Sequence, residues 1–445
     1  MKICVLSGSP KGKNSITFQT ILFLQRKFPQ DSFETLHVGP RIKSLEKDFS
    51  PAREALERAD LLLFCYPVYT FIVPYQLHRF VELMKQSGVT LSGKYAAQVS
   101  TSKHFYDVTA HGFIRENCLD MGLKYLGGLS ADMDDLLKEQ GQKDAVAFWE
   151  LVHFRAKEDI YTPFPKRAPA AVPAYVPSGI RKEKLPGREV VIVANLLPGD
   201  DDLAAMIQDF QDQYPHASRV VNLNEYPFRG GCLGCFHCAV SGKCVYTDGF
   251  DEFLRTQIQG GSAIVYAFRI QDHSMGSRMK LYDDRQFCNG HRTVTSGMPM
   301  GYLIQGDLEN EPNLQVIIEG RGDVGGNFLA GIATDAAGVS ALARELDYAL
   351  ERKLTQPATF WGVGGMKIFR DLIYLMQGMM KADHKYYKAH GIYDFPQKQP
   401  GTILKMRLVG ALLSNPKIMA KAGSKMTEGM LMPYTKLFEK MDKES

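Results

Sequence analysis

Long apolar runs are absent from this sequence. No window offers about 18 consecutive apolar residues, the length that a membrane-spanning helix needs. The opening residues form a strand-like run, without the basic region, long apolar stretch and small-residue cleavage site of a signal peptide. We therefore expect neither a spanning helix nor a secretory signal, and we expect a cytoplasmic location.

A strong charge bias is also absent. The formal net charge of the 445 residues is +4, so the overall field gives no reason to expect a nucleic-acid partner. Hydrophobic residues make up 45% of the chain and charged residues 23%. This composition is ordinary for a soluble protein that buries real cores, and the length allows roughly two or three domains.

Cysteine is present but unevenly distributed. Four of the eight cysteines fall between Cys232 and Cys244, whereas Cys4 and Cys65 lie inside apolar, strand-like runs and are typical core residues. In a cytoplasmic chain, clustered cysteines indicate metal or redox chemistry rather than a disulfide scaffold.

Apolar runs alternate with helical patterns over residues 1–157, the first predicted domain. The runs are continuous, which is typical of strands buried on both faces, and a helix is predicted from Pro74 to Met84 between two of them. Strands that alternate with helices predict an α/β domain with a parallel sheet. The strand candidates are residues 3–6, 61–65, 95–100 and, more weakly, 125–129.

Six prolines between residues 161 and 187 then interrupt the pattern. Proline at that density continues neither a helix nor a central strand, so we expect a Pro-rich linker over residues 158–187. The alternation restarts in a second predicted domain, residues 188–354, which includes a long helix from Ala336 to Arg352. Because residues 59–66 resemble residues 261–268, we interpret this domain as a diverged repeat of the first.

Residues 355–445 differ in character and are predicted to form a helical C-terminal extension. The tail beyond residue 402 is net basic. We favour an extension that packs against the second domain or against a sister subunit of a homodimer. The alternative is a basic interfacial segment that contacts a membrane or a redox partner. One helical face is predicted from the spacing of Phe369, Leu372, Ile373, Met376, Met379 and Met380.

A loop rich in small polar residues, 7–17, follows the first strand and leads into a predicted helix. The backbone N–H groups of such a loop and the helix dipole favour a bound anion. The loop lacks the ending of a Walker A motif and the glycine spacing of a dinucleotide fingerprint. A phosphate site is favoured over an ordinary Gly/Ser-rich turn. The predicted phosphate contacts are Ser9, Lys11, Asn14, Ser15, Ile16 and Thr17.

Two further loops, residues 66–70 and 100–106, follow the predicted strands 61–65 and 95–100. Ligands of doubly wound sheets bind beyond the carboxyl ends of the strands. Both loops offer aromatic faces for stacking and donors for ring heteroatoms. A flat heterocycle that carries a phosphate is therefore the expected ligand.

The three loops, in this order and spacing, resemble those of the flavodoxin-fold NAD(P)H-dependent FMN reductases over about residues 1–155. The resemblance implies two tandem flavodoxin-like, doubly wound parallel sheets, with FMN in the first. His104 is either a ring contact or an ordinary loop histidine. The ring contacts that the resemblance implies are Pro67, Val68, Tyr69, Thr101, Ser102, Lys103, His104, Phe105 and Tyr106.

The second half carries the motif C-x2-C-x2-C-x5-C, formed by Cys232, Cys235, Cys238 and Cys244. Four closely spaced thiolates satisfy a [4Fe–4S] cluster, whereas a structural zinc site usually has two separated pairs. The motif resembles that of the iron–sulfur flavoproteins. The cluster is favoured, and a redox thiol or disulfide, or zinc, are the alternatives.

The second half lacks the phosphate loop of the first. Three carboxylates, Asp200, Asp201 and Asp202, stand where a phosphate would bind and would repel it. Phe268-Arg269-Ile270 also replaces the Pro-Val-Tyr sequence of the first half. We therefore expect no FMN in the second domain.

Together these features predict an FMN-dependent oxidoreductase. It would take a hydride from NAD(P)H and pass electrons to a quinone, flavin or redox protein. If the cysteine motif holds a cluster, the electrons would be passed on one at a time through it. The sequence identifies no catalytic acid or base. Two alternatives remain: a non-enzymatic flavodoxin/ferredoxin-like electron carrier, and a redox sensor that uses the four cysteines.

Overall fold

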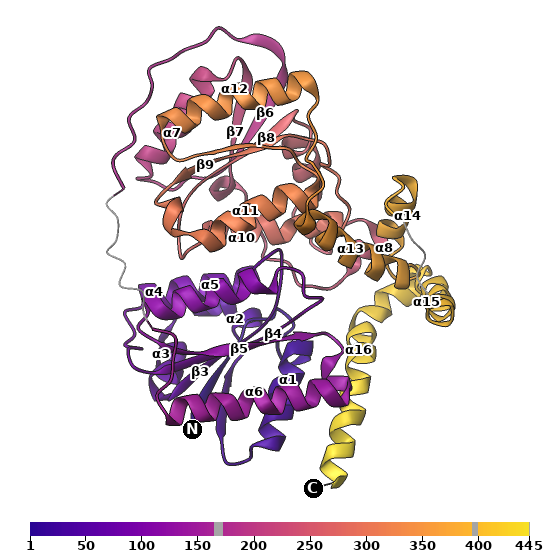
Figure 1. Ribbon diagram of the computed structural model, residues 1–445. Helices are drawn as coiled ribbons and strands as arrows, with labels where there is room; N and C mark the ends of the chain where they lie inside the picture. Colours follow the sequence, from indigo (N-terminus) through magenta and orange to yellow (C-terminus); the bar gives the residue numbers. More distant parts are fainter. Residues whose placement is uncertain (164–171, 394–398, 445) are drawn as a thin grey trace. The chain divides into compact units, whose positions relative to one another are not determined.

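The chain forms two compact units in the computed structural model, which describes residues 1–163, 172–393 and 399–444. Unit 1 comprises Met1–Arg167, Cys232–Gly234 and Ser414–Ser445, and unit 2 comprises Ala168–Gly231 and Cys235–Leu413. Each unit contains a sheet of five parallel strands flanked by helices (Figure 1). The predicted α/β fold with two flavodoxin-like sheets and C-terminal helices is confirmed.

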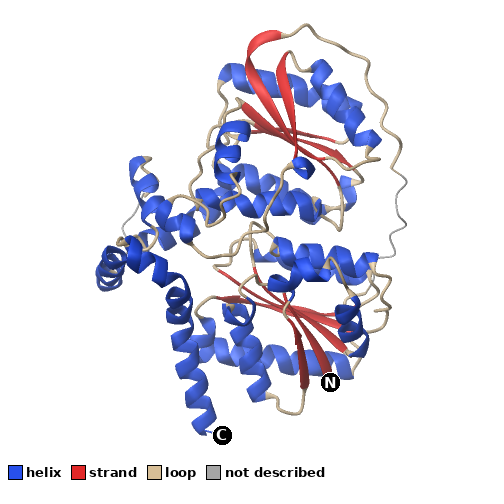
Figure 2. Ribbon diagram, turned by 180° about the vertical axis from the view of Figure 1, so that it is seen from behind, coloured by secondary structure: helices blue, strands red, loops and turns tan. Residues whose placement is uncertain are grey.

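The centre of unit 1 is its parallel sheet. The strands are β1 (Lys2–Ser7), β2 (Ser32–Leu36), β3 (Leu61–Pro67), β4 (Tyr95–Ser102) and β5 (Lys124–Asp132). Their order is β2-β1-β3-β4-β5. Figure 2 shows the strands in red, flanked by helices in blue. The central strands β1 and β3 are buried almost throughout because helices cover both faces, whereas the edge strand β2 alternates between exposed and partly buried positions. The continuous apolar runs thus predicted the central strands and missed β2.

Helices cover both faces of this sheet. The helices are α1 (Ile16–Lys27), α2 (Val38–Leu45), α3 (Ser50–Arg58), α4 (Tyr75–Gln86), α5 (Asp107–Asp120), α6 (Glu139–Lys157) and α16 (Pro416–Glu444). α1 and α6 lie over one face, and α4 and α5 over the other (Figure 1). The C-terminal helix α16 adds Tyr434 and Phe438 to the core that α1 and α6 form with the strands.

Unit 2 repeats this topology. Its strands are β6 (Leu185–Asn195), β7 (His216–Asn222), β8 (Ala263–Arg269), β9 (Met300–Gln305) and β10 (Leu329–Ala333). Their order, β7-β6-β8-β9-β10, is the order of unit 1 with every strand five places later in the chain. The internal repeat inferred from two similar segments therefore extends to the whole sheet.

The helices of unit 2 include two pairs that cover its sheet. α7 and α12 lie over one face and share its core, and α10 and α11 lie over the other (Figure 1). The helices are α7 (Asp201–Gln213), α8 (His237–Ser241), α9 (Phe250–Phe253), α10 (Gly276–Arg285), α11 (Pro312–Gly325), α12 (Ala336–Arg352), α13 (Phe360–Leu375), α14 (Lys381–Ala389) and α15 (Pro400–Leu413).

The C-terminal helices test two predictions of helix bounds. α12 has the predicted bounds. The methionine-rich helix is shorter than predicted, because α13 ends at Leu375 and Met380 lies in the turn before α14. Ile373 and Met380 still share one buried cluster, so the predicted apolar face is retained across the break. No helix in the described ranges is long and apolar enough to span a membrane.

Asp31 joins the start of β2 to α6. Its buried carboxylate accepts hydrogen bonds from Trp149 Nε1 at 2.9 Å and from His153 Nε2 at 2.7 Å. Burial raises the pKa of Asp31, but the bonds from Trp149 and His153 outweigh it and hold the pKa below its usual value. A depressed pKa means that the ionised carboxylate stabilises the fold at neutral pH.

We expect Asp31→Asn to lower the free energy of unfolding by about 2–4 kcal/mol at pH 7, because buried, charge-assisted hydrogen bonds are lost. The deficit should shrink as the pH falls below about 4, because the wild-type carboxylate then becomes protonated. Urea denaturation between pH 7 and pH 3 measures both effects. Asp144→Asn, at an exposed position of α6, should change stability by less than about 0.5 kcal/mol. Equal losses in the two variants would contradict the role of Asp31.

Candidate functional site

Three loops of unit 1 meet at the carboxyl edge of its sheet, after β1, β3 and β4. They hold the predicted phosphate and ring contacts. The hydroxyl groups of Thr17 and Thr101 lie 2.5 Å apart and join the first loop to the third. The backbone N–H of Val68 donates to the carbonyl oxygen of Thr101 at 3.1 Å and joins the second loop to the third. A hydrogen bond between residues 84 positions apart in the sequence thus helps to bring the loops together in one site.

The first loop is shaped as an anion site. Gly12 adopts a positive φ of 52°, and its N–H donates to the carbonyl oxygen of Ser9 at 3.0 Å. Ser15 is the N-cap of α1 but makes no side-chain cap bond, so the first-turn N–H groups keep their capacity for another acceptor. The hydroxyl of Ser7 is buried and has no partner among the described residues. An uncapped helix start beside buried hydroxyls fits the phosphate of FMN.

The predicted phosphate contacts divide by burial. Ser9, Ser15 and Thr17 are buried, Lys11 and Ile16 are partly buried, and Asn14 is exposed. Lys13, a loop residue outside the predicted set, is also exposed. The short hydroxyl donors therefore line the inside of the loop, and the lysines supply positive charge around it.

The second loop is a tight turn. Tyr69 and Ile72 exchange two backbone hydrogen bonds, 2.8 and 3.1 Å long, around Thr70 and Phe71. Both central residues have positive φ, 39° and 74°, a conformation that favours glycine or asparagine. Strained turns of this kind occur at functional sites, where the surrounding fold holds them in place. Pro67, Val68 and Tyr69 stay partly exposed beside it.

The third loop carries a linked His–Asp–Ser set. His104 adopts a φ of 57°, and its N–H donates to the Ser102 hydroxyl at 2.8 Å. Its Nδ1 lies 2.8 Å from the Asp107 carboxylate, which also accepts a 2.5 Å bond from Ser130. Burial raises the pKa of Asp107, but the hydrogen bonds from Ser130 and His104 lower it by more. The pKa therefore lies below its usual value, and the carboxylate stays ionised. An exposed imidazole is thus held at a fixed position in the predicted ring loop.

Two predicted ring contacts have other partners in this unit. Lys103 Nζ pairs with the Asp132 carboxylate at 2.6 Å. Tyr106 is buried, and its ring packs against Phe71 and Phe105 with centroids 4.3 and 4.8 Å away. Phe105 and Ser102 remain partly exposed at the loop. The roles of all these residues toward a flavin ring remain predictions.

Two residues that support the site were not predicted from the sequence. Gly39 of α2 packs against the first loop so closely that a side chain there would overlap the carbonyl oxygen of Ser9. His111 of α5 lies 2.8 Å from the hydroxyl of Ser100 in β4. Burial lowers the pKa of His111 to about 4, so the imidazole is neutral at pH 7 and holds β4 by a hydrogen bond.

Unit 2 keeps the turn of the second loop but not the phosphate loop. Gln271 and Ser274 exchange two backbone bonds of 2.9 Å around Asp272 and His273, which have φ values of 53° and 59°. This turn matches the one at Tyr69–Ile72 and is further evidence of the repeat.

Two of the carboxylates of unit 2 that replace the phosphate loop, Asp200 and Asp202, are already paired. Asp200 accepts the N–H of Leu197 at 2.9 Å and lies 3.5 Å from the guanidinium of Arg269. Asp202 accepts a bond from Gln305 at 3.1 Å. The chain thus places its own hydrogen-bonded carboxylates at this position, and the absence of an FMN phosphate there stays a prediction.

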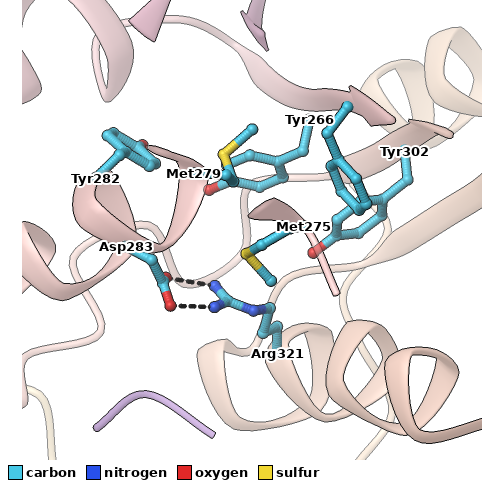
Figure 3. A pocket seen from close by; sticks show the side chains of 8 residues that line it. Tyr266, Met275, Met279, Tyr282, Asp283, Tyr302 and Arg321 are labelled. Carbon is cyan, nitrogen blue, oxygen red and sulfur yellow. Dashed lines mark hydrogen bonds and ion pairs between the residues drawn. The ribbon is translucent and has the colours of Figure 1, made fainter. Parts of the chain in front are cut away.

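A small cavity in unit 2 is lined by side chains of β8, β9, α10 and α11 (Figure 3). Arg321 and Asp283 form a bidentate ion pair across it, with one N–O distance of 2.6 Å. Tyr302 adds a buried hydroxyl that has no partner among the described residues. The cavity has room for about one water molecule, so it is not a flavin site.

The cysteine motif spans the short helix α8, which contains Cys238. Cys235 is exposed, and Cys238 and Cys244 are partly buried in unit 2, while Cys232 is among the residues grouped with unit 1. Burial raises the pKa of Cys238 to about 12, and the neighbouring Cys235 adds to that rise. Without a metal, Cys238 is therefore a neutral thiol at pH 7 rather than a reactive thiolate.

The sulfur atoms of unit 2 do not form a zinc site as they stand. Among the described residues, no three cysteine sulfurs lie within 4.8 Å of one another. A tetrahedral zinc ion with Zn–S bonds of about 2.3 Å would hold its sulfurs closer than that. Zinc stays an alternative to the cluster.

An ion pair in unit 2 holds the segments on either side of the motif. The buried guanidinium of Arg285 bonds both oxygens of Asp248, at 2.7 and 2.8 Å, and the carbonyl oxygen of Gly230 at 3.0 Å. Gly230 precedes the four cysteines and Asp248 follows them. Arg285 thus fixes both flanks of the loop.

The family model of the NADPH-dependent FMN reductases matches residues 1–111, about a quarter of the chain. All three loops lie within these residues. Residues 1–111 are therefore similar to that family. The predicted resemblance is thereby confirmed for this part of unit 1. The match to this family indicates an NAD(P)H-dependent flavin oxidoreductase with FMN as its cofactor. None of the curated proteins matches the chain.

Solved structures similar to parts of the chain include a putative quinone reductase from Klebsiella pneumoniae, with 15% identity and a TM-score of 0.28, covering 40% of this chain and 91% of that one. An FMN-dependent NADH-azoreductase from Bacillus anthracis, solved with FMN, has 12% identity and a TM-score of 0.27, over 35% and 98% of the two chains. General stress protein 14 from Treponema denticola, also solved with FMN, has 14% identity and a TM-score of 0.28, over 34% and 98%. Likenesses this remote carry no argument about function.

Proposed function

We propose that the FMN reductase domain binds FMN with its phosphate in the loop Ser9–Thr17 and its ring between residues 67–69 and 101–106. It takes a hydride from NAD(P)H and passes electrons to an acceptor of the quinone, flavin or redox-protein class. Cys232, Cys235, Cys238 and Cys244 would hold a [4Fe–4S] cluster, which would supply one-electron transfer when bound. FMN, when bound, supplies the hydride chemistry, and the chain binds and orients it.

The convergence of three loops at one sheet edge, within the part of the chain that matches the family, carries this proposal. The Thr17–Thr101 bond fixes the phosphate loop against the ring loop. The uncapped start of α1 and the buried hydroxyls of Ser9 and Ser15 are donors suited to a dianion. The spacing of the four cysteines supports the cluster.

The absorption spectrum of the purified full chain tests the flavin. We expect flavin bands that bleach when NADH or NADPH is added without oxygen, because a hydride is transferred to the bound ring. A colourless chain that also fails to bind added riboflavin 5′-phosphate would contradict the FMN site. A bound flavin that only a partner protein reduces would instead favour the electron carrier.

A further inference from the structure

Helix α15 of unit 2 exposes an apolar stripe. Leu404, Leu408 and Leu412 follow one another at four-residue spacing, so they lie on the same side of the helix. Their exposed fractions are 59%, 63% and 64%. Single exposed leucines are ordinary on a protein surface, but three adjacent ones on one helix form a continuous patch that indicates a binding surface.

The opposite side of α15 holds the helix in unit 2. Ile403, Gly410 and Leu413 are buried there. Gly410 packs directly on the backbone of Gly378. Arg407 lies at the border between the two sides: the residue is exposed, and its guanidinium donates to the side-chain oxygen of Gln377 at 3.1 Å. The exposed leucines therefore do not contribute to the packing that positions the helix.

Positive charge accompanies the stripe. At about 100° per residue, Lys405 and Arg407 lie on opposite sides of the three leucines, and both are exposed. Residues 355–427 contain eleven basic and three acidic side chains, although the whole chain has a net charge of only +4. The remaining residues are therefore net acidic, and the basic charge is concentrated around this helix in the sequence.

We propose that α15 docks on the surface of a membrane that contains anionic phospholipids. A convex apolar stripe between two cations fits an interface where acyl chains lie beneath negative headgroups. A second copy of the chain is the poorer partner, because a symmetric contact through α15 would bring Lys405 and Arg407 against their own equivalents. The leucines enter the acyl boundary, and the cations lie at headgroup level.

Flotation of the full chain with phosphatidylcholine vesicles, with and without phosphatidylglycerol, tests this proposal. We expect binding to the anionic vesicles only, decreasing as salt is added. The variant L404Q/L408Q/L412Q should bind at least about tenfold more weakly, because the buried apolar area is lost. The control L185Q/L197Q/V294Q removes three exposed apolar side chains elsewhere in unit 2 and should bind like the wild type.

Hydrogen exchange of the wild type gives a second measurement that needs no variant. Backbone amides of residues 400–413 should gain protection when anionic vesicles are added. Unchanged exchange in that helix, or equal binding to both kinds of vesicle, would overturn the proposal. So would sedimentation data in which the wild type self-associates without vesicles and the triple variant is a monomer, because the stripe would then belong to a second copy. Circular dichroism confirms that the variants are folded.

Discussion

Gly39→Ala is expected to weaken FMN binding by about a hundredfold while the chain stays folded. A Cβ on Gly39 would overlap the carbonyl of Ser9 and lie 2.7 Å from the backbone nitrogen of Pro10. Backbone atoms cannot rotate away, so the phosphate loop itself must move. The loss of about two charge-assisted hydrogen bonds to a phosphate amounts to about 3 kcal/mol, which corresponds to a factor of about a hundred in the dissociation constant.

Titration of the flavin-free protein with FMN, followed by flavin fluorescence, measures this effect. Gly364→Ala is the matched control, because Gly364 lies in α13 with open space around its missing Cβ. That variant should bind FMN like the wild type. Thr17→Val offers an independent check, since it keeps the shape of the side chain and removes only the bond to Thr101. Unchanged affinity in both Gly39→Ala and Thr17→Val would show that the phosphate binds elsewhere.

The packing of Gly39 on the first loop could not be predicted from the sequence. The loop that contains Ser9 could be predicted, because strand, small polar residues and helix follow one another within residues 2–27. Gly39 lies in a separate helix, and a single glycine carries no signal that another backbone packs against it. Only the folded chain brings the two together.

Central and edge strands also differ in how well the sequence predicts them. β1 and β3 were predicted because both of their faces are buried, which requires continuous apolar runs. β2 was missed because an edge strand is covered less and needs fewer apolar residues. The turn at Thr70 and Phe71 also escaped prediction, since bulky residues are rarely found at positive φ. The tertiary structure, rather than local preference, imposes that conformation.

Long-range pairing accounts for the remaining differences. Nothing in the sequence near residue 434 indicates that α16 packs on the core of unit 1, 400 residues from β1 and α1. Likewise, Asp31 is an ordinary turn residue in the sequence and a buried partner of Trp149 in the structure. Such contacts join positions whose local patterns are independent, so each pattern alone predicts an element but not its neighbour.

Cys238→Ser is expected to reduce the iron and acid-labile sulfide of anaerobically purified protein from about four of each per chain to less than one, while FMN content is unchanged. A [4Fe–4S] cluster needs a thiolate at each iron, and serine is a poor replacement. The flanks of the motif should stay in place in the variant, because Arg285 still bonds Asp248 and the Gly230 carbonyl. The loss would therefore come from the missing ligand rather than from a disordered loop.

Cys118→Ala is the control, because Cys118 is a buried core residue of α5 in unit 1. It should keep wild-type iron and sulfide, with only a modest loss of thermal stability. Because FMN and iron are measured separately, protein that contains FMN but no iron would contradict the cluster and still support the FMN site. Zinc in place of iron in the wild type would favour the zinc alternative, and metal-free protein with titratable thiols would favour the redox thiol. Iron retained in full by Cys238→Ser would exclude Cys238 as a ligand, because the cluster would then hold without the thiolate at the centre of the motif.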